Sequence, residues 1–163
     1  MLQLVILCGM PAGQPLTTVD PATNPRLATL LAFWQSLRQE NGLVAKRDFN
    51  PFALQPWLGF ISLFEKVGDD FIIRLDGSEI VRMTGEEWTG RRVSEADKHY
   101  KIDLIASLRI MEAESRPIFH PKHFIATKPF MTVGRLILPL SNDGATITHA
   151  AIALLPNAGS QMN

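Results

Sequence analysis

Residues 71–95, FIIRLDGSEIVRMTGEEWTGRRVSE, constrain the fold more than any other part of this chain. Glycines at positions 77, 85 and 90 interrupt the stretch three times. The pattern predicts a strand, a short amphipathic helix capped by Ser78, and two further turns that flank Trp88. A segment that changes direction so often encloses a space rather than spanning a distance. We therefore expect it to form one wall of a cleft.

Composition limits the classes of protein to consider. A chain of 163 residues has the size of one domain that can bury a core. It is 46% hydrophobic and 20% charged, and its 16 Lys and Arg balance 16 Asp and Glu. A nucleic-acid-binding domain usually carries a basic excess on one face. The pairs Arg91-Arg92 and Lys98-His99 are too short to supply one, so we expect no nucleic-acid partner.

The first 24 residues are predicted to be a flexible N-terminal extension. Residues 1–10 are apolar, but they lack a preceding Lys or Arg and are far fewer than the roughly 20 needed to span a bilayer. Residues 11–25 are rich in Pro, Gly and Thr, as linkers often are. The single cysteine, Cys8, excludes an internal disulfide and is consistent with a reducing compartment. We expect a cytoplasmic protein without a membrane span.

Residues 25–156 are predicted to form a single domain, with a disordered tail at 157–163. Two strands are expected before the middle helices and three after a longer helix: 61–67, 71–76, 117–127, 130–140 and 146–155, with that helix at about 97–114. The prolines in 117–127 indicate a bulged or edge strand, and the apolar last strand is expected at the centre of the sheet. This order favours an α+β fold with a five-stranded antiparallel sheet and the middle helices across one face. Phe71, Ile73 and Leu75 are expected on one face of their strand.

An extra amphipathic helix is predicted before this sheet, over residues 25–41. Asn24-Pro25 forms a good start and Asn41-Gly42 a stop. The helix must pack on the back of the domain, on a second copy of the chain, or on both. Because its stripe has few expected partners inside the domain, we predict a homodimer through these side chains: Leu27, Leu30, Leu31, Trp34 and Leu37.

Several short motifs resemble a known family. They are WQSLR at 34–38, DFNP at 48–51, RLDGSEIV at 74–81, TGRRV at 89–93 and LPLSNDG at 138–144. In combination, over about residues 26–155, they are similar to short bacterial proteins of the fifth PAS-fold family. The resemblance implies a PAS-like sensory or ligand-binding module that acts on an unknown signalling protein, and it implies no catalytic activity. In this fold a cleft lies between the sheet and its connecting helices.

A ligand in that cleft is expected to be small and either apolar or amphipathic. Trp88 either lines the pocket or plugs the core beneath its loop. Arg135 either faces the cleft, where it could pair with an anionic group, or lies on the surface. The candidate cleft residues are Ile80, Met83, Trp88, Ile105, Leu108, Phe124, Met131 and Arg135.

Metal, haem and flavin are not expected as cofactors. His120 and His123 point to opposite faces of an extended strand, which does not suit a shared metal. One haem ligand would have to come from a histidine, but no helical pocket flanks any of the four: His99, His120, His123 and His149. Flavin photochemistry of the light-sensing PAS type needs a cysteine beside the ring, and Cys8 precedes the domain.

Two other functions stay open at this stage. A small enzyme could transfer protons with Asp76, Asp103 or His120, provided that the group is buried and its pKa is shifted. A structural adaptor would instead fill the cleft with its own side chains.

Overall fold

The structure is a computed structural model that describes residues 16–125 and 128–160, and within these ranges five strands form one sheet. The strands are β1 (Ile61–Val67), β2 (Asp70–Leu75), β3 (Ile118–Ile125), β4 (Lys128–Leu140) and β5 (His149–Pro156). They lie in the order β2-β1-β5-β4-β3, and every neighbouring pair is antiparallel. The predicted five-stranded antiparallel sheet is confirmed, with the apolar last strand at its centre.

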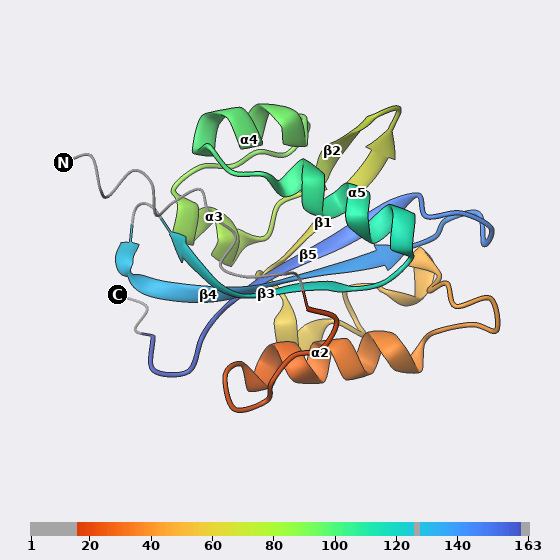
Figure 1. The fold of residues 1–163 in the computed structure, drawn as a ribbon, viewed down its shortest axis with the longest axis horizontal. Coiled ribbons are helices and arrows are strands. Elements are labelled where there is room, and N and C mark those ends of the chain that lie inside the picture. Colours follow the sequence, from red (N-terminus) through yellow and green to blue (C-terminus); the bar gives the residue numbers. More distant parts are fainter. Residues whose placement is uncertain (1–15, 126–127, 161–163) are drawn as a thin grey trace.

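Helices cover both faces of the sheet (Figure 1). The helices α3 (Ser78–Thr84), α4 (Val93–Tyr100) and α5 (Leu104–Glu114) lie on one face, as predicted for the middle segment. Helix α2 (Pro25–Ser36) lies on the other face. Two short 3-10 helices, η1 (Lys46–Asp48) and η2 (Gln55–Trp57), connect α2 to β1. No helix in the described part of the chain is long and apolar enough to cross a bilayer.

Helix α2 starts where the sequence predicts and ends early. Asn24 Oδ1 accepts a hydrogen bond of 3.2 Å from the amide of Leu27, and Pro25 is the first helical residue. The helix stops at Ser36 rather than at residue 41. Gly42, with a φ of 81°, then turns the chain toward η1.

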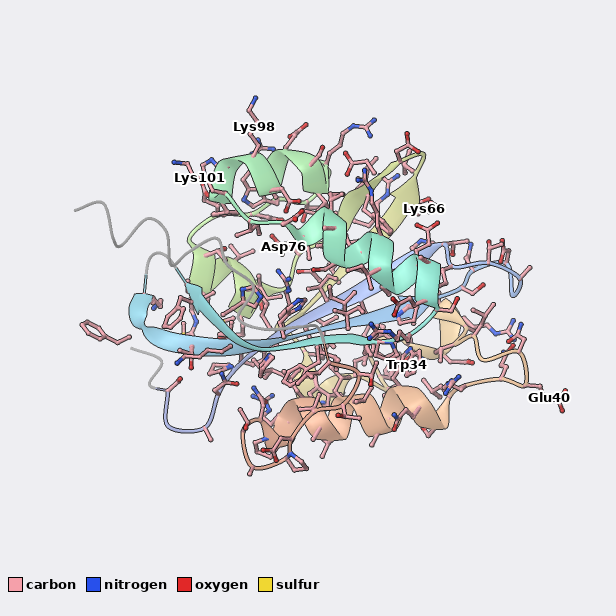
Figure 2. All side chains as sticks on the ribbon, viewed as in Figure 1. Trp34, Glu40, Lys66, Asp76, Lys98 and Lys101 are labelled. Atoms are coloured by element: carbon pink, nitrogen blue, oxygen red, sulfur yellow. The ribbon has the colours of Figure 1, made fainter. Side chains whose placement is uncertain are left out.

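The apolar stripe of α2 packs against the sheet of its own chain. Figure 2 shows Trp34 between α2 and the sheet, where its Nε1 donates to the Pro139 carbonyl over 3.0 Å. Leu37 is half-buried at the margin of the same core. The expectation of few partners within one chain is wrong for the four residues that expose at most 5% of their surface: Leu27, Leu30, Leu31 and Trp34. Helical periodicity shows that a face is buried, but not what covers it.

The helix predicted over 97–114 is in fact two helices. Lys101 adopts a left-handed backbone with a φ of 54°, which ends α4. The Asp97 carboxylate then accepts hydrogen bonds of 2.9 Å from the amides of Leu104 and Ile105, and so caps α5 from within α4.

A bulge separates Leu75 from the other apolar residues of β2. The register between β1 and β2 shifts between Leu63 and Phe64, which reverses the faces of the strand beyond that point. Phe71 and Ile73 are therefore buried, whereas Leu75 is 56% exposed. The prediction that all three share a face is wrong at Leu75.

Both predicted flexible ends contain packed residues. Leu16 exchanges two backbone hydrogen bonds with Phe119, of 2.9 and 2.6 Å. At the other end, Asn157 accepts from Asn24 Nδ2 over 3.0 Å and donates to the Pro121 carbonyl over 2.9 Å. Residues 16–24 and 157–160 therefore pack on the domain, beyond its predicted limits. The rest of the predicted extension, including Cys8, and residues 161–163 lie outside the described residues.

Irregular segments of the chain also pair with both edge strands. On the outer side of β3, Leu16 forms the bridge to Phe119. On the outer side of β2, Ile73 donates to the Arg91 carbonyl over 3.0 Å and accepts from the Gly90 amide over 2.7 Å. Part of each edge is therefore covered by backbone from the same chain.

Candidate functional site

A cavity of about 170 Å³ lies between the sheet and the layer formed by α3, α4 and α5. Its walls are mainly apolar, and several polar side chains reach it from different elements. The apolar lining residues are Phe64, Ile73, Ile80, Trp88, Ala96, Ile102, Leu104, Phe124, Ile125, Val133, Ile152 and Leu154. The polar ones are Ser62, Asp76, Thr84, Tyr100, His123 and Arg135.

Four of the eight predicted cleft residues line this cavity: Ile80, Trp88, Phe124 and Arg135. Three others, Met83, Leu108 and Met131, are at most 2% exposed and lie within the packed cores instead. Ile105 is also absent from the wall, and its neighbours Ile102 and Leu104 are present.

Asp76 holds the wall formed by residues 71–95 in place. Its Oδ1 accepts a hydrogen bond of 2.6 Å from the Ser62 hydroxyl on β1, and its Oδ2 accepts one of 3.1 Å from the Trp88 amide. Figure 2 shows Asp76 between the sheet and the helices above it. Both carboxylate oxygens thus connect the loop after α3 to the first strand.

Gly77, the residue after Asp76, must lack a side chain because two backbone segments meet there. A Cβ at Gly77 would lie 2.4 Å from the Gly59 carbonyl oxygen and 2.8 Å from that of Ile61. Gly77, and not the predicted Ser78, is the capping position before α3, and it makes no side-chain cap. The sequence Asp-Gly here lets two backbone segments pass in contact beside Asp76.

Trp88 is both buried and part of the cavity wall. It is 4% exposed, and its Nε1 donates to the Tyr100 hydroxyl over 2.9 Å. Tyr100 donates in turn to Glu86 over 2.7 Å, and the Arg91 guanidinium lies 3.8 Å from the centroid of the indole ring. Burial, with help from Glu86, raises the pKa of Tyr100 to about 12, so this hydroxyl stays protonated.

Arg135 is a buried cation, not the surface residue that the sequence left as an alternative. It is 6% exposed, and among the described residues no carboxylate lies within ion-pair distance of it. Its Nη2 donates to Ser107 Oγ on α5 over 3.3 Å and to His120 Nδ1 over 3.4 Å. Burial lowers the pKa of Arg135 to about 10, which leaves it charged at neutral pH.

His120 and His123 lie side by side, contrary to the prediction of opposite faces. The register between β3 and β4 shifts between them, next to Pro121, and their ring centroids are 5.6 Å apart. The predicted edge position and bulge of β3 are thus confirmed, and the bulge is what reorients one ring. Burial and the nearby Arg135 charge lower the pKa of His120 to about 4 and that of His123 to about 3. Both imidazoles are therefore neutral at pH 7.

Of the acid–base groups proposed from sequence, His120 meets the stated condition, because it is buried and its pKa is lowered to about 4. Asp103 is exposed, and both oxygens of Asp76 accept hydrogen bonds that hold the fold. His120 is buried, but its Nδ1 accepts from Arg135. The described residues contain no metal-binding group of three or more His, Cys, Asp or Glu.

The size of the cavity bears on larger cofactors. A volume of about 170 Å³ is close to that of an engineered cavity of about 150 Å³ that holds benzene, and below the roughly 300–1,000 Å³ of drug-sized sites. Haem and flavin are at least of drug size and exceed this volume. Of the other histidines, His99 contacts Glu86 over 2.9 Å, and neither His99 nor His149 is part of the wall.

Comparison with known proteins agrees with this architecture. A family model described as PAS domain matches residues 22–151. The chain belongs to the PAS domain family. No curated protein matches this PAS chain. A solved structure entitled "Structure of an RNA-binding Light-Oxygen-Voltage Receptor" is similar to it, with a TM-score of 0.51 and 13% identity.

That similarity covers 88% of the PAS chain and 37% of the receptor chain. The present chain therefore spans little more than a third of the length of the receptor. At 13% identity the likeness shows a shared fold and nothing of a shared ligand.

Proposed function

We propose that this PAS chain is a non-catalytic sensory or regulatory module that binds a small, mainly apolar molecule between its sheet and helices α3 to α5. The cavity of about 170 Å³ carries the proposal. An adaptor that fills the cleft with its own side chains would leave less space between the sheet and these helices.

The contacts of one wall residue suggest how ligand binding in the cavity could change the surface of the domain. Tyr100 lines the cavity from the end of α4, and its hydroxyl bonds to Glu86, which also contacts His99. A ligand that displaces the Tyr100 ring would therefore alter contacts on the outer side of α4. Figure 2 shows Lys98 and Lys101 on that outer side, where a partner protein could read the change.

The predicted partners are part of this proposal. A signalling protein and a second copy of the chain remain predicted partners, and a cytoplasmic location remains predicted. A homodimer would have to use surface other than the four α2 side chains buried against the sheet. We do not extend RNA binding to this chain, because its Lys and Arg are balanced by Asp and Glu and a basic face is what such binding requires.

Thermal melting with small apolar molecules tests the proposal. Toluene should raise the Tm of the wild-type chain, because a molecule that binds only the folded state stabilises it. Ala96 lines the cavity from α4 and is buried, so Ala96→Met should occupy part of the space and reduce the shift. Native mass spectrometry of protein purified without denaturation should detect a bound small molecule. The proposal fails if toluene leaves the Tm unchanged and no bound mass is found.

A further inference from the structure

Among the described residues, two buried side-chain polar atoms lack a hydrogen-bond partner: Arg135 Nε and His123 Nε2. Their residues come from different strands, β4 and β3, yet both line the same cavity. Buried polar atoms in folded proteins are nearly always hydrogen-bonded. Two unpaired nitrogens at one cavity therefore indicate a missing acceptor rather than two separate defects in packing.

The charge around Arg135 indicates which kind of acceptor is missing. A guanidinium removed from water needs an anion or a complete set of acceptors nearby. Its contacts within the described residues are neutral, to Ser107 Oγ and His120 Nδ1. The Asp97 and Asp103 carboxylates act on it only from beyond ion-pair distance. The oxygens of Asp97 already accept from the amides at the start of α5.

We infer that the cavity binds a small monocarboxylate, with the carboxylate on Arg135 and His123 and the apolar part against the remaining wall. The two carboxylate oxygens would accept from Arg135 Nε–H and from the Nε2–H tautomer of neutral His123. This inference rests on the proposed function and specifies the class of ligand. A phosphate group brings more acceptor oxygens than these two donors can satisfy, and the rest of the wall is mainly apolar.

The surroundings hold the guanidinium ready for such a ligand. Within the described residues, both hydrogen bonds of Arg135 use Nη2, one to α5 and one to the bulged part of β3. They fix the plane of the group and leave Nε free. His120 and Ser107 therefore act as positioning residues for Arg135, and the bulge at Pro121 brings His123 beside them.

Isothermal titration at pH 7.5 with matched pairs of probes tests the inference. Hexanoate is compared with hexanamide, and benzoate with benzamide, because each pair differs in charge and hardly in size. We expect at least one carboxylate to bind at least tenfold more tightly than its amide. In Arg135→Met this preference should disappear. Arg135→Gln serves as a second neutral variant if the first does not fold.

Two matched variants test His123, the second proposed donor. His123→Gln retains an N–H near the position of Nε2 and should keep the carboxylate affinity within about threefold. His123→Leu removes the donor and should lower it at least fivefold. Equal affinity for carboxylates and amides, or a preference that persists in the folded Arg135 variant, would overturn the inference.

The toluene melting experiment shows whether a negative result concerns the carboxylate assignment alone or also the proposed function. If toluene raises the Tm but neither carboxylate binds, the cavity takes ligands and the carboxylate assignment is wrong. If toluene and both carboxylates all fail to bind, both proposals are wrong.

Discussion

Replacing Arg135 by Met should stabilise the free protein, although it removes a side chain with two hydrogen bonds. Burial lowers the pKa of the guanidinium from 12.5 to about 10. At 1.36 kcal/mol per unit of pKa, this shift means that the charged guanidinium lowers the free energy of unfolding at pH 7 by about 3 kcal/mol. Methionine is uncharged and flexible enough to fill the same space.

The lost hydrogen bonds offset part of this gain. The Ser107 hydroxyl and His120 Nδ1 each lose a donor, and each loss costs about 1 kcal/mol. The expected result is therefore a variant that is more stable by about 1 kcal/mol. Replacing buried charges with apolar groups of similar volume has this outcome in other proteins.

Urea denaturation at pH 7.5, followed by tryptophan fluorescence, measures the difference. The slope of the free energy against urea should stay unchanged, so that the midpoint reports stability. Arg109→Met is the matched control, because Arg109 lies exposed on α5, and its effect should stay within about 0.5 kcal/mol. A loss of 1 kcal/mol or more in Arg135→Met would show that the chain itself compensates the buried charge, and the need for an external anion would disappear.

Three further predictions concern stability. Between pH 6.5 and pH 5, His120 and His123 become protonated in the unfolded chain but not in the folded chain, where their pKa values are about 4 and 3. The free energy of unfolding, measured by urea denaturation, should therefore fall by about 2 kcal/mol for each histidine between pH 7.5 and pH 5. His123→Gln should remove the contribution of His123 to this loss. Asp76→Ala deletes the acceptor of the Ser62 hydroxyl and the Trp88 amide and should cost about 2–3 kcal/mol in the same assay, with a red shift of the tryptophan emission. Gly77→Ala places a Cβ against backbone carbonyls and should cost about 1–3 kcal/mol; an unchanged Tm would contradict the close approach.

The parts of the fold that were predictable are those with local signals. The glycines of residues 71–95 mark turns, and the hairpin signals connect neighbouring strands, so the sheet and the position of Trp88 follow from sequence. Ile80 was placed correctly for the same reason, because its helix is short and clearly bounded. A strand pattern also indicated that Pro121 interrupts the ladder, and the structure has its bulge there.

The remaining features depend on backbone register, which composition and periodicity do not encode. A shift next to Pro121 brings two histidines together that strict alternation separates. Lys101 breaks a helix in a left-handed conformation that usually signals itself through glycine. Arg135 could have been found, because it is the one charge within the otherwise apolar run VGRLIL. A charge in an otherwise apolar strand is seldom buried without a partner.

The covered edges of the sheet limit how this domain can associate. An unpaired strand edge can form backbone hydrogen bonds with a further strand, from a partner or from another copy of the chain. Here Leu16 pairs with the outer side of β3, and Gly90 and Arg91 pair with that of β2. Strand addition is thus blocked at these positions, which also protects the domain against edge-to-edge aggregation. A partner is therefore kept from adding a strand at these positions, and truncation past Leu16 would expose the backbone of Phe119 on the outer side of β3.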